Sequence, residues 1–248
     1  MKYLILFLVV TAGLILYLNR SYAHIFSFLN ANNPGTPTTH MSIVIPAPSP
    51  TSSSRLKYVA LGDSLTAGAG AATEAESYPY RLAKLLAEKR GAEVILENLG
   101  QPGATTINVL NQQVPLVAAL HPDIVTLLIG VNDLHNQMPS DLFKKNLTAI
   151  VDGLSSSTKH LNIITIPYLG NSSAFMPPYQ TYYDLQTKRY NDLLREALSG
   201  KKVSFIDLYS LTREQAFDDA GYYSPDGFHP SAETYNFWSK LLYDHLNY

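Results

Sequence analysis

Residues 58–65 carry the sequence YVALGDSL, a short apolar run that ends in a Gly-Asp turn followed by a serine. An apolar run of this length, bounded by turn residues, is typical of a buried strand. Four similar runs follow it, at 94–96, 124–129, 163–166 and 203–206. Helical stretches separate these runs, and the alternation predicts right-handed βαβ units. We therefore expect an α/β fold with a five-stranded parallel sheet that is covered by helices on both faces.

The spacing of apolar side chains places the helices. Leu82, Leu85 and Leu86 fall on one face of a predicted helix over 80–90, and Gly91 ends that helix as a C-cap. Further helices are expected over 105–120, 140–154, 182–198 and 231–246.

Polar residues of unusual character follow four of the predicted strands. Residues 63–64 come after the first strand, 100–103 after the second, 132–133 after the third, and 226–229 between the fifth strand and the last helix. In an open parallel sheet, reacting residues lie in the loops beyond the carboxyl ends of the strands. We therefore expect these four segments to meet on one rim of the domain.

The composition is that of a single globular domain. The chain has 248 residues, of which 46% are hydrophobic, enough for one sizeable core. Charged residues make up only 15% and the formal net charge is -2, so no basic excess indicates a nucleic-acid partner. The absence of cysteine excludes disulfides, thiolate catalysis and cysteine metal sites.

The N-terminus carries a separate signal. A lysine precedes an apolar run over 4–18, which as a helix spans about 22 Å, short of the ~30 Å hydrocarbon core of a bilayer. That length fits a signal peptide, and Ser-Tyr-Ala at 21–23 offers a cleavage site. Apolar residues continue over 25–29, however, which an uncleaved helix could use to reach the interface. We expect residues 1–29 to be either a signal peptide cut near Ala23 or a membrane anchor, and the domain to be extracytoplasmic.

Residues 30–54 are rich in Pro, Ser, Thr and Asn, a composition that cannot bury a core and that proline keeps extended. We interpret this segment as a linker to a domain that comprises 55–248. Ile-Val-Ile at 43–45 is a short strand candidate inside the linker, and the predicted sheet does not include it.

Ser64 stands where a nucleophile would lie beside the backbone N–H groups of the next segment. A hydroxyl is a poor nucleophile until a base takes its proton. Alone, the same residues are equally typical of a turn in which Asp63 or Ser64 caps the backbone. A catalytic interpretation therefore depends on a base elsewhere in the chain.

His229 is the best-placed candidate base among the seven histidines. It ends the segment Asp-Gly-Phe-His at 226–229, where the Asp226 carboxylate can accept one ring N–H and set the tautomer. His135 is a rival, since it follows the third strand beside Asp133. An Asp-x-x-His pair alone occurs by chance in roughly half of chains this long.

Acyl transfer also needs hydrogen-bond donors for the oxyanion of its transition state. Asn132 supplies a side-chain amide at the end of the third strand, and Gly103 and Ser64 can each supply a backbone N–H. Standing alone, Asn132 would be an ordinary strand-end turn residue.

Four segments together resemble the sequence blocks of the SGNH hydrolases, the GDSL-type lipases and esterases. They are Gly-Asp-Ser-Leu at 62–65, Gly103, Gly-Val-Asn-Asp at 130–133, and Asp-Gly-Phe-His at 226–229, in the order of that family. The resemblance covers about residue 57 to the C-terminus and implies a three-layer α/β/α sandwich of flavodoxin-like kind.

The resemblance also implies roles for individual residues. Ser64 would be the nucleophile and would complete a triad with Asp226 and His229, while Ser64, Gly103 and Asn132 would form the oxyanion hole. No metal or organic cofactor is implied. The second block departs from the family pattern, because Pro102 stands where a serine is frequent, and Gly100 is an alternative to Gly103 as the donor.

We expect a serine esterase that hydrolyses an acyl ester, lysophospholipid or thioester through an acyl-enzyme. A carbohydrate O-deacetylase or acetyltransferase of the cell envelope is the alternative, and a non-catalytic binding domain of the same fold is a second one. Aromatic residues over 167–183 either line the substrate pocket or cover the core edge. The expected partners are a small-molecule, lipid or glycan ester and, through the N-terminal segment, a membrane. We expect no nucleic-acid partner and a monomeric chain.

Overall fold

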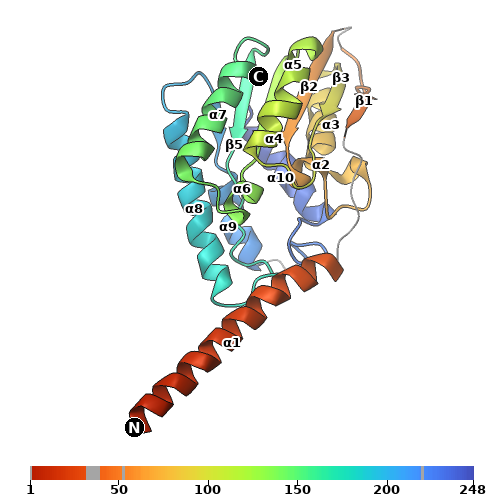
Figure 1. The fold of residues 1–248 in the computed structure, drawn as a ribbon. Coiled ribbons are helices and arrows are strands. Elements are labelled where there is room, and N and C mark those ends of the chain that lie inside the picture. Colours follow the sequence, from red (N-terminus) through yellow and green to blue (C-terminus); the bar gives the residue numbers. More distant parts are fainter. Residues whose placement is uncertain (1, 32–39, 52–53, 219–220) are drawn as a thin grey trace.

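The computed structural model describes residues 2–31, 40–51, 54–218 and 221–248 (Figure 1). Within them, all five predicted strands are present and are parallel to one another. They are β2 (Arg55–Gly62), β3 (Glu93–Asn98), β4 (Ile124–Leu128), β5 (His160–Ile164) and β6 (Ser204–Ile206). Their order across the sheet is β3-β2-β4-β5-β6, which is the flavodoxin-like order.

A sixth strand makes the sheet mixed, so the expectation of five strands, all parallel, is wrong by one strand. Strand β1 (Met41–Ile45) pairs antiparallel with the outer edge of β3. Met41 and Ile45 are buried, so this edge strand both covers apolar surface and satisfies the open backbone groups of β3. The segment predicted as a linker over 30–54 therefore contributes to the sheet, and its residues 32–39 and 52–53 lie outside the described part of the chain.

Helices cover both faces of the sheet, as predicted (Figure 1). On one face α3 (Tyr78–Arg90) packs against α10 (Ala232–His245), and on the other α7 (Ser140–Leu154) packs against α5 (Val114–Leu120) and α8 (Tyr179–Ala197). The remaining helical segments are α1 (Lys2–Ala31), α2 (Ser64–Ala67), the 3-10 turn Glu74–Glu76, α4 (Thr106–Asn108), α6 (Val131–His135) and α9 (Leu208–Asp218).

Local capping explains why several helices begin and end where they do. The Ser77 hydroxyl accepts the backbone N–H of Tyr80 at the start of α3, and Gly91 ends that helix in the left-handed conformation at φ 58°. The Ser231 hydroxyl caps α10 in the same way, by accepting the N–H of Thr234.

The predicted helix over 105–120 is broken into three parts. The short α4 is followed by a π-helical turn, Val109–Gln113, and then by α5. Pro115 lies in the first turn of α5 and has no N–H to donate, so the α-helical pattern cannot run through it unchanged. The turn presents the Gln113 side chain to the end of β2, where its amide accepts the Gly62 N–H at 2.9 Å and donates to the Gly62 carbonyl at 2.8 Å.

Two other side-chain amides make the same double contact with a backbone N–H and carbonyl. Asn191 of α8 binds both groups of Ile166, at 2.8 and 2.9 Å, and Asn162 of β5 binds both groups of Asn247, at 2.9 and 3.0 Å. These amides attach helices and the C-terminus to the sheet in a chain that has no cysteine.

Helix α1 projects from the domain at the edge where the strands end (Figure 1). Its span Lys2–Ser21 is long and apolar enough to cross a membrane, with a mean hydropathy of 1.9. It meets the domain at the loop before α8, where the Tyr17 hydroxyl donates to the Pro177 carbonyl at 2.5 Å.

Candidate active site

Ser64 is the first residue of α2 and follows directly on the central strand β2. The Asp63 carboxylate accepts the N–H of Leu65 at 3.0 Å and so caps α2. The capping interpretation of Asp63 is therefore correct, and it leaves the half-buried Ser64 hydroxyl available for other contacts. Because β2 and β4 flank the point where the strand order reverses, this is the position at which α/β sheets of this order bind ligands.

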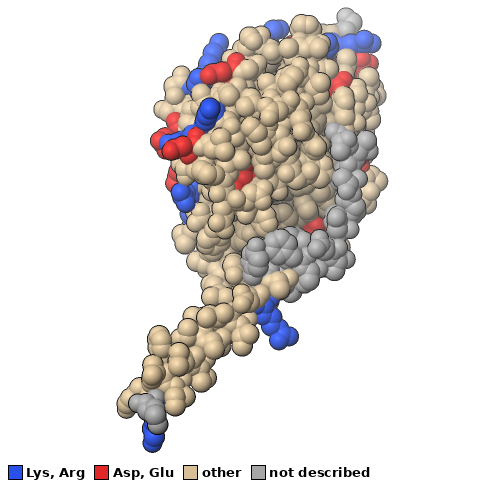
Figure 2. Space-filling model, in the orientation of Figure 1, with Lys and Arg blue, Asp and Glu red and all other residues tan. Residues whose placement is uncertain are grey.

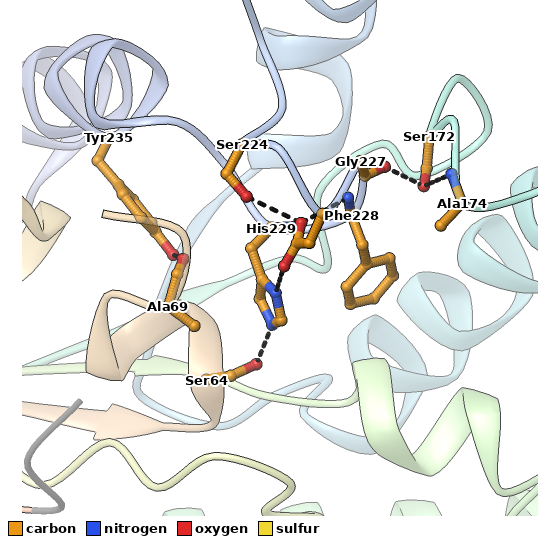
Figure 3. A network of polar contacts seen from close by, with 10 residues as sticks. Ser64, Ala69, Ser172, Ala174, Ser224, Gly227, Phe228, His229 and Tyr235 are labelled. Atoms are coloured by element: carbon orange, nitrogen blue, oxygen red, sulfur yellow. Dashed lines mark hydrogen bonds and ion pairs between the residues drawn. The ribbon is translucent and has the colours of Figure 1, made fainter. Parts of the chain in front are cut away.

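The Ser64 hydroxyl points at the His229 ring, and the two residues come from opposite ends of the domain sequence (Figure 3). The distance from His229 Nε2 to Ser64 Oγ is 3.0 Å, and that from His229 Nδ1 to Asp226 Oδ2 is 2.6 Å. A carboxylate at Nδ1 stabilises the tautomer that carries its proton there. Nε2 is then an acceptor facing the serine hydroxyl.

Asp226 is itself held by three further donors. Its Oδ1 accepts the Ser224 hydroxyl at 2.8 Å and the backbone N–H groups of Phe228 and His229, both at 2.9 Å. Gly227 makes this tight turn in the left-handed conformation at φ 65°. Burial acts to raise the pKa of Asp226, but the hydrogen bond and charge of His229 and the two backbone N–H groups outweigh it and leave the pKa below its ordinary value. The carboxylate is thus ionised at neutral pH.

A neighbouring loop supports the turn that carries His229 (Figure 3). The Ser172 hydroxyl donates to the Gly227 carbonyl at 2.6 Å, and the Ala174 N–H approaches the same oxygen at 3.4 Å. On the other side, the Tyr235 hydroxyl donates to the Ala69 carbonyl at 2.7 Å and ties α10 to the segment after α2. Ser172 and Tyr235 carry no sequence signal for these roles, whereas Ser224, two residues before Asp226, could have been suspected.

The expected oxyanion donors lie in the loops after β3 and β4. Asn132, in the first turn of α6, donates one amide hydrogen to the Ala104 carbonyl at 2.9 Å and has a second one to offer. This contact joins the Asn132 side chain to the loop that contains Gly103. Gly103 adopts φ 77°, a Cβ there would meet nothing within 4 Å, and its N–H has no hydrogen-bond partner among the described residues.

Gly100, the alternative donor, has a different role in the structure. Its N–H donates to the Asn98 side chain at 3.0 Å, and a Cβ at this position would lie 2.5 Å from the backbone N of Ala67. The absence of a side chain thus lets the loop pack against α2. The geometry therefore favours Gly103 over Gly100 as a donor.

Asp133, next to Asn132, joins the loop after β4 to the segment after β3 through its contacts with Thr106. Its carboxylate accepts the Thr106 N–H at 3.0 Å and the Thr106 hydroxyl at 2.5 Å, and Asn146 of α7 donates to that hydroxyl at 3.0 Å. Asp133 is completely buried, and burial raises its pKa. Its place beside Asn132 marks it in the sequence, whereas nothing in the sequence marks its partner Thr106.

His135, the rival base, forms no part of the Ser64 network. Its Nδ1 lies 2.8 Å from the Tyr183 hydroxyl, and burial lowers its pKa. It lines a cavity of about 300 Å³ one turn beyond Asn132, together with Leu134, Gln137, Tyr179, Tyr182 and Tyr183.

Some of the aromatic residues over 167–183 belong to the buried core, and others line the cavity beside α6. Tyr168 and Phe175 are buried, whereas Tyr179 and Tyr182 line the cavity. Phe175 stacks on Tyr183 with ring centroids 3.9 Å apart and also meets the edge of Phe228, the neighbour of His229. Stacked and edge-on rings thus connect the cavity to the triad.

Across the described residues, no group of three or more His, Cys, Asp or Glu side chains is arranged to hold a metal ion.

Comparisons with known proteins agree with this fold. An arylesterase from Vibrio mimicus is 28% identical over 180 residues, which cover 71% of this chain and 81% of that protein. Among solved structures, a catalytic mutant of an acetylxylan esterase from Geobacillus stearothermophilus has a TM-score of 0.63 at 17% identity, covering 82% of this chain and 96% of that one. TesA has a TM-score of 0.63 at 19% identity, covering 76% of this chain and 97% of that one.

The model of the GDSL-like lipase/acylhydrolase family matches residues 60–237, most of the chain. The matched region includes every residue of the Ser64, His229 and Asp226 network and both candidate oxyanion loops. The chain therefore belongs to the GDSL-like lipase/acylhydrolase family of ester-hydrolysing enzymes.

Proposed function

We propose that this protein is a serine esterase that cleaves carboxylic esters through an acyl-enzyme on Ser64, with His229 as base and Asp226 as its partner. The observation that supports this most directly is the unbroken chain of contacts from the Ser64 hydroxyl through His229 to Asp226, at 3.0 and 2.6 Å. Distances of this size are those at which a nucleophile and its base exchange a proton.

The proposed reaction begins with attack of Ser64 Oγ on the ester carbonyl carbon while His229 Nε2 accepts the hydroxyl proton. Asp226 stabilises the resulting imidazolium through its contact with Nδ1. His229 then donates that proton to the departing alcohol oxygen, which leaves the acyl group on Ser64. Water then gives a proton to the same ring as its oxygen attacks the acyl carbon. The bond from that carbon to Ser64 Oγ breaks, the ring returns the proton to Oγ, and the carboxylic acid is released.

The negative charge that develops on the carbonyl oxygen needs donors that are fixed in advance. The backbone N–H groups of Ser64 and Gly103 and the second amide hydrogen of Asn132 are the donors we assign. The bond between the Asn132 amide and the Ala104 carbonyl supports this assignment, because it orients the side chain toward the Gly103 loop.

The proposed substrate is a small-molecule, lipid or glycan ester. The similarity to the arylesterase of Vibrio mimicus supports a simple ester of small size as the first candidate. The second candidate is removal of O-acetyl groups from carbohydrates, which is favoured by the cavity beside α6, since His135, Gln137 and three tyrosines offer both hydrogen bonds and ring faces. Residues 55–248 are the proposed catalytic domain, and it is proposed to act outside the cytoplasm.

A fluorophosphonate probe, which reacts only with an activated serine, tests the mechanism. Wild type should be labelled, and Ser64→Ala should lose both labelling and aryl-ester turnover at a nearly unchanged melting temperature. Ser156→Ala, at an exposed serine after α7, is the matched control and should behave as wild type. Labelling that persists in Ser64→Ala, or a large fall in its melting temperature, would rule out the proposed role.

The two substrate classes are separated by comparing rates. Hydrolysis of aryl esters of increasing acyl length is measured beside release of acetate from acetylated oligosaccharides. A rate that is confined to acetyl groups and is higher on the oligosaccharide would replace the first candidate by the second.

A further inference from the structure

Helix α1 does not leave the domain as a free tether but contacts it at the edge that carries the triad. The Tyr17 hydroxyl donates to the Pro177 carbonyl at 2.5 Å, and the Tyr179 hydroxyl donates in return to the Leu18 carbonyl at 3.4 Å. One turn further on, Ser21 is only 2% exposed. These contacts fix the last turn of the apolar span to the start of α8.

Packed aromatic rings connect the segment that receives α1 to the catalytic machinery. Pro177 follows Phe175 by two residues, and Phe175 packs edge-on against Phe228 at 5.8 Å between ring centroids. Phe228 in turn meets the His229 ring at 5.1 Å. The α1 contact and the proposed nucleophile therefore lie on the same rim of the domain.

The loop that receives α1 and the first two turns of α8 expose large apolar side chains. Met176, Tyr182 and Leu185 are 38%, 40% and 57% exposed, and we call these three residues the apolar rim. In Figure 2, Lys, Arg, Asp and Glu side chains lie mainly at the top and along the left flank of the domain, while the surface directly above α1 is mostly uncharged. Large apolar side chains exposed together with few charges mark a surface that binds a membrane or a protein.

The length of α1 favours a membrane over a protein as the partner of this surface. The apolar span Lys2–Ser21 has 20 residues, longer than the run over 4–18 seen in the sequence, because the helix continues through Asn19 and Arg20. At 1.5 Å per residue it covers about 30 Å, the thickness of the hydrocarbon core. Since the domain contacts this span at Tyr17 and Leu18, no spacer remains between the lipid and the domain. Tyr17 lies where tyrosines gather at membrane interfaces.

We propose that α1 is retained as a membrane anchor and that the apolar rim rests on the bilayer surface, so that the active site opens at the membrane. The partner of this surface is the lipid bilayer itself. This placement of the domain is the same whichever ester the enzyme cleaves. A substrate would reach Ser64 from the lipid interface instead of from bulk water.

The test uses the full chain in phosphatidylcholine vesicles. Because the chain has no cysteine, Met176→Cys carries a single environment-sensitive fluorophore in the apolar rim. Lys202→Cys, exposed before β6 at the other end of the sheet, is the matched control. The label at position 176 should emit at shorter wavelength and be quenched by quenchers on lipid headgroups, and the label at 202 should show neither effect. Equal behaviour of the two labels would overturn the proposal.

Two further measurements make the test specific. Tyr17→Phe combined with Tyr179→Phe removes only the hydroxyl contacts, so quenching at position 176 should fall while the chain stays in the vesicles. Unchanged quenching would contradict docking through these residues, and an intact mass that lacks residues 1–23 in the chain recovered from its host would contradict retention. Hydrolysis of a water-soluble aryl ester by the unsubstituted chain, without vesicles, tests the triad separately. No turnover there would count against the proposed function and not against the membrane contact.

Discussion

Replacing Asp63 by asparagine should remove a destabilisation of the folded state that grows with pH, so the free energy of unfolding should change differently with pH in the variant and in wild type. Asp63 is completely buried, and its Oδ2 has no hydrogen-bond partner among the described residues, although Oδ1 accepts the Leu65 N–H. Burial raises the pKa of Asp63, the Leu65 N–H opposes that rise, and the negative charge of Asp133 adds to it. The outcome is a pKa of about 7 against an ordinary value of 3.8.

The size of the effect follows from the difference between these two pKa values. Each pKa unit corresponds to about 1.36 kcal/mol, so a shift of about 3 units is worth about 4 kcal/mol. Below the unfolded pKa the carboxyl is protonated in both states and costs nothing. As the pH rises from about 4 to about 7 the unfolded chain releases its proton first, and the free energy of unfolding falls. Above about 7 both states are ionised, and the cost is complete and constant.

The Asp63→Asn variant would keep the oxygen that caps α2 but would carry no charge there at any pH. The free energy of unfolding of Asp63→Asn minus that of wild type should therefore rise with pH, by up to about 4 kcal/mol between about pH 4 and pH 7. Urea unfolding followed by circular dichroism at a series of pH values gives this difference directly. Asp192→Asn, at an exposed position of α8, is the matched control for loss of one carboxyl group. A difference for Asp63→Asn that stays flat across the range would show that burial does not raise the pKa of Asp63 in the folded state.

Three further substitutions test the rest of the site. Asp226→Asn should lower kcat for aryl-ester hydrolysis by about 10⁴-fold, because an amide no longer selects the His229 tautomer; a loss below about tenfold would argue against the triad. Asn132→Ala should cost about 2.7–4 kcal/mol of transition-state stabilisation, seen as a fall in kcat with little change in KM. If only KM changes, Asn132 binds substrate and is no oxyanion donor. Gly100→Ala places a Cβ 2.5 Å from the Ala67 nitrogen, so α2 must shift and the free energy of unfolding should drop by about 1–3 kcal/mol in urea titrations. Wild-type stability of that variant would contradict the packing role.

Much of this site can be predicted from sequence because its residues follow strands. A buried strand is evident from a local apolar run, and the parallel sheet then brings the residues after each run to one edge without any knowledge of side-chain contacts. Ser64 and His229 are 165 positions apart, yet this reasoning assigns both to one rim, and the structure places them 3.0 Å from each other.

The features that escape prediction depend on partners that are distant in the chain. Strand β1 is five residues long in a Pro- and Ser-rich segment, and only its pairing with β3 makes it a strand. The support of the Gly227 turn by Ser172 and the contact of Thr106 with Asp133 are also tertiary, and a lone serine or threonine shows no pattern that marks it. The position of His135 after β4 makes it a candidate base, but burial beside Tyr183 gives it another environment.

The double contact of Gln113 with Gly62 means that the active site depends on one side-chain amide remaining chemically intact. Its two hydrogen bonds need a nitrogen on one side and an oxygen on the other. Asn and Gln side chains are prone to hydrolysis of the amide at high temperature. At Gln113 this reaction would set a carboxylate oxygen against the Gly62 carbonyl and place a negative charge beside the end of β2, two residues before Ser64. Loss of activity in stored or heated enzyme can therefore begin at a side chain that never touches substrate, and a mass increase of about one dalton at Gln113 would record it.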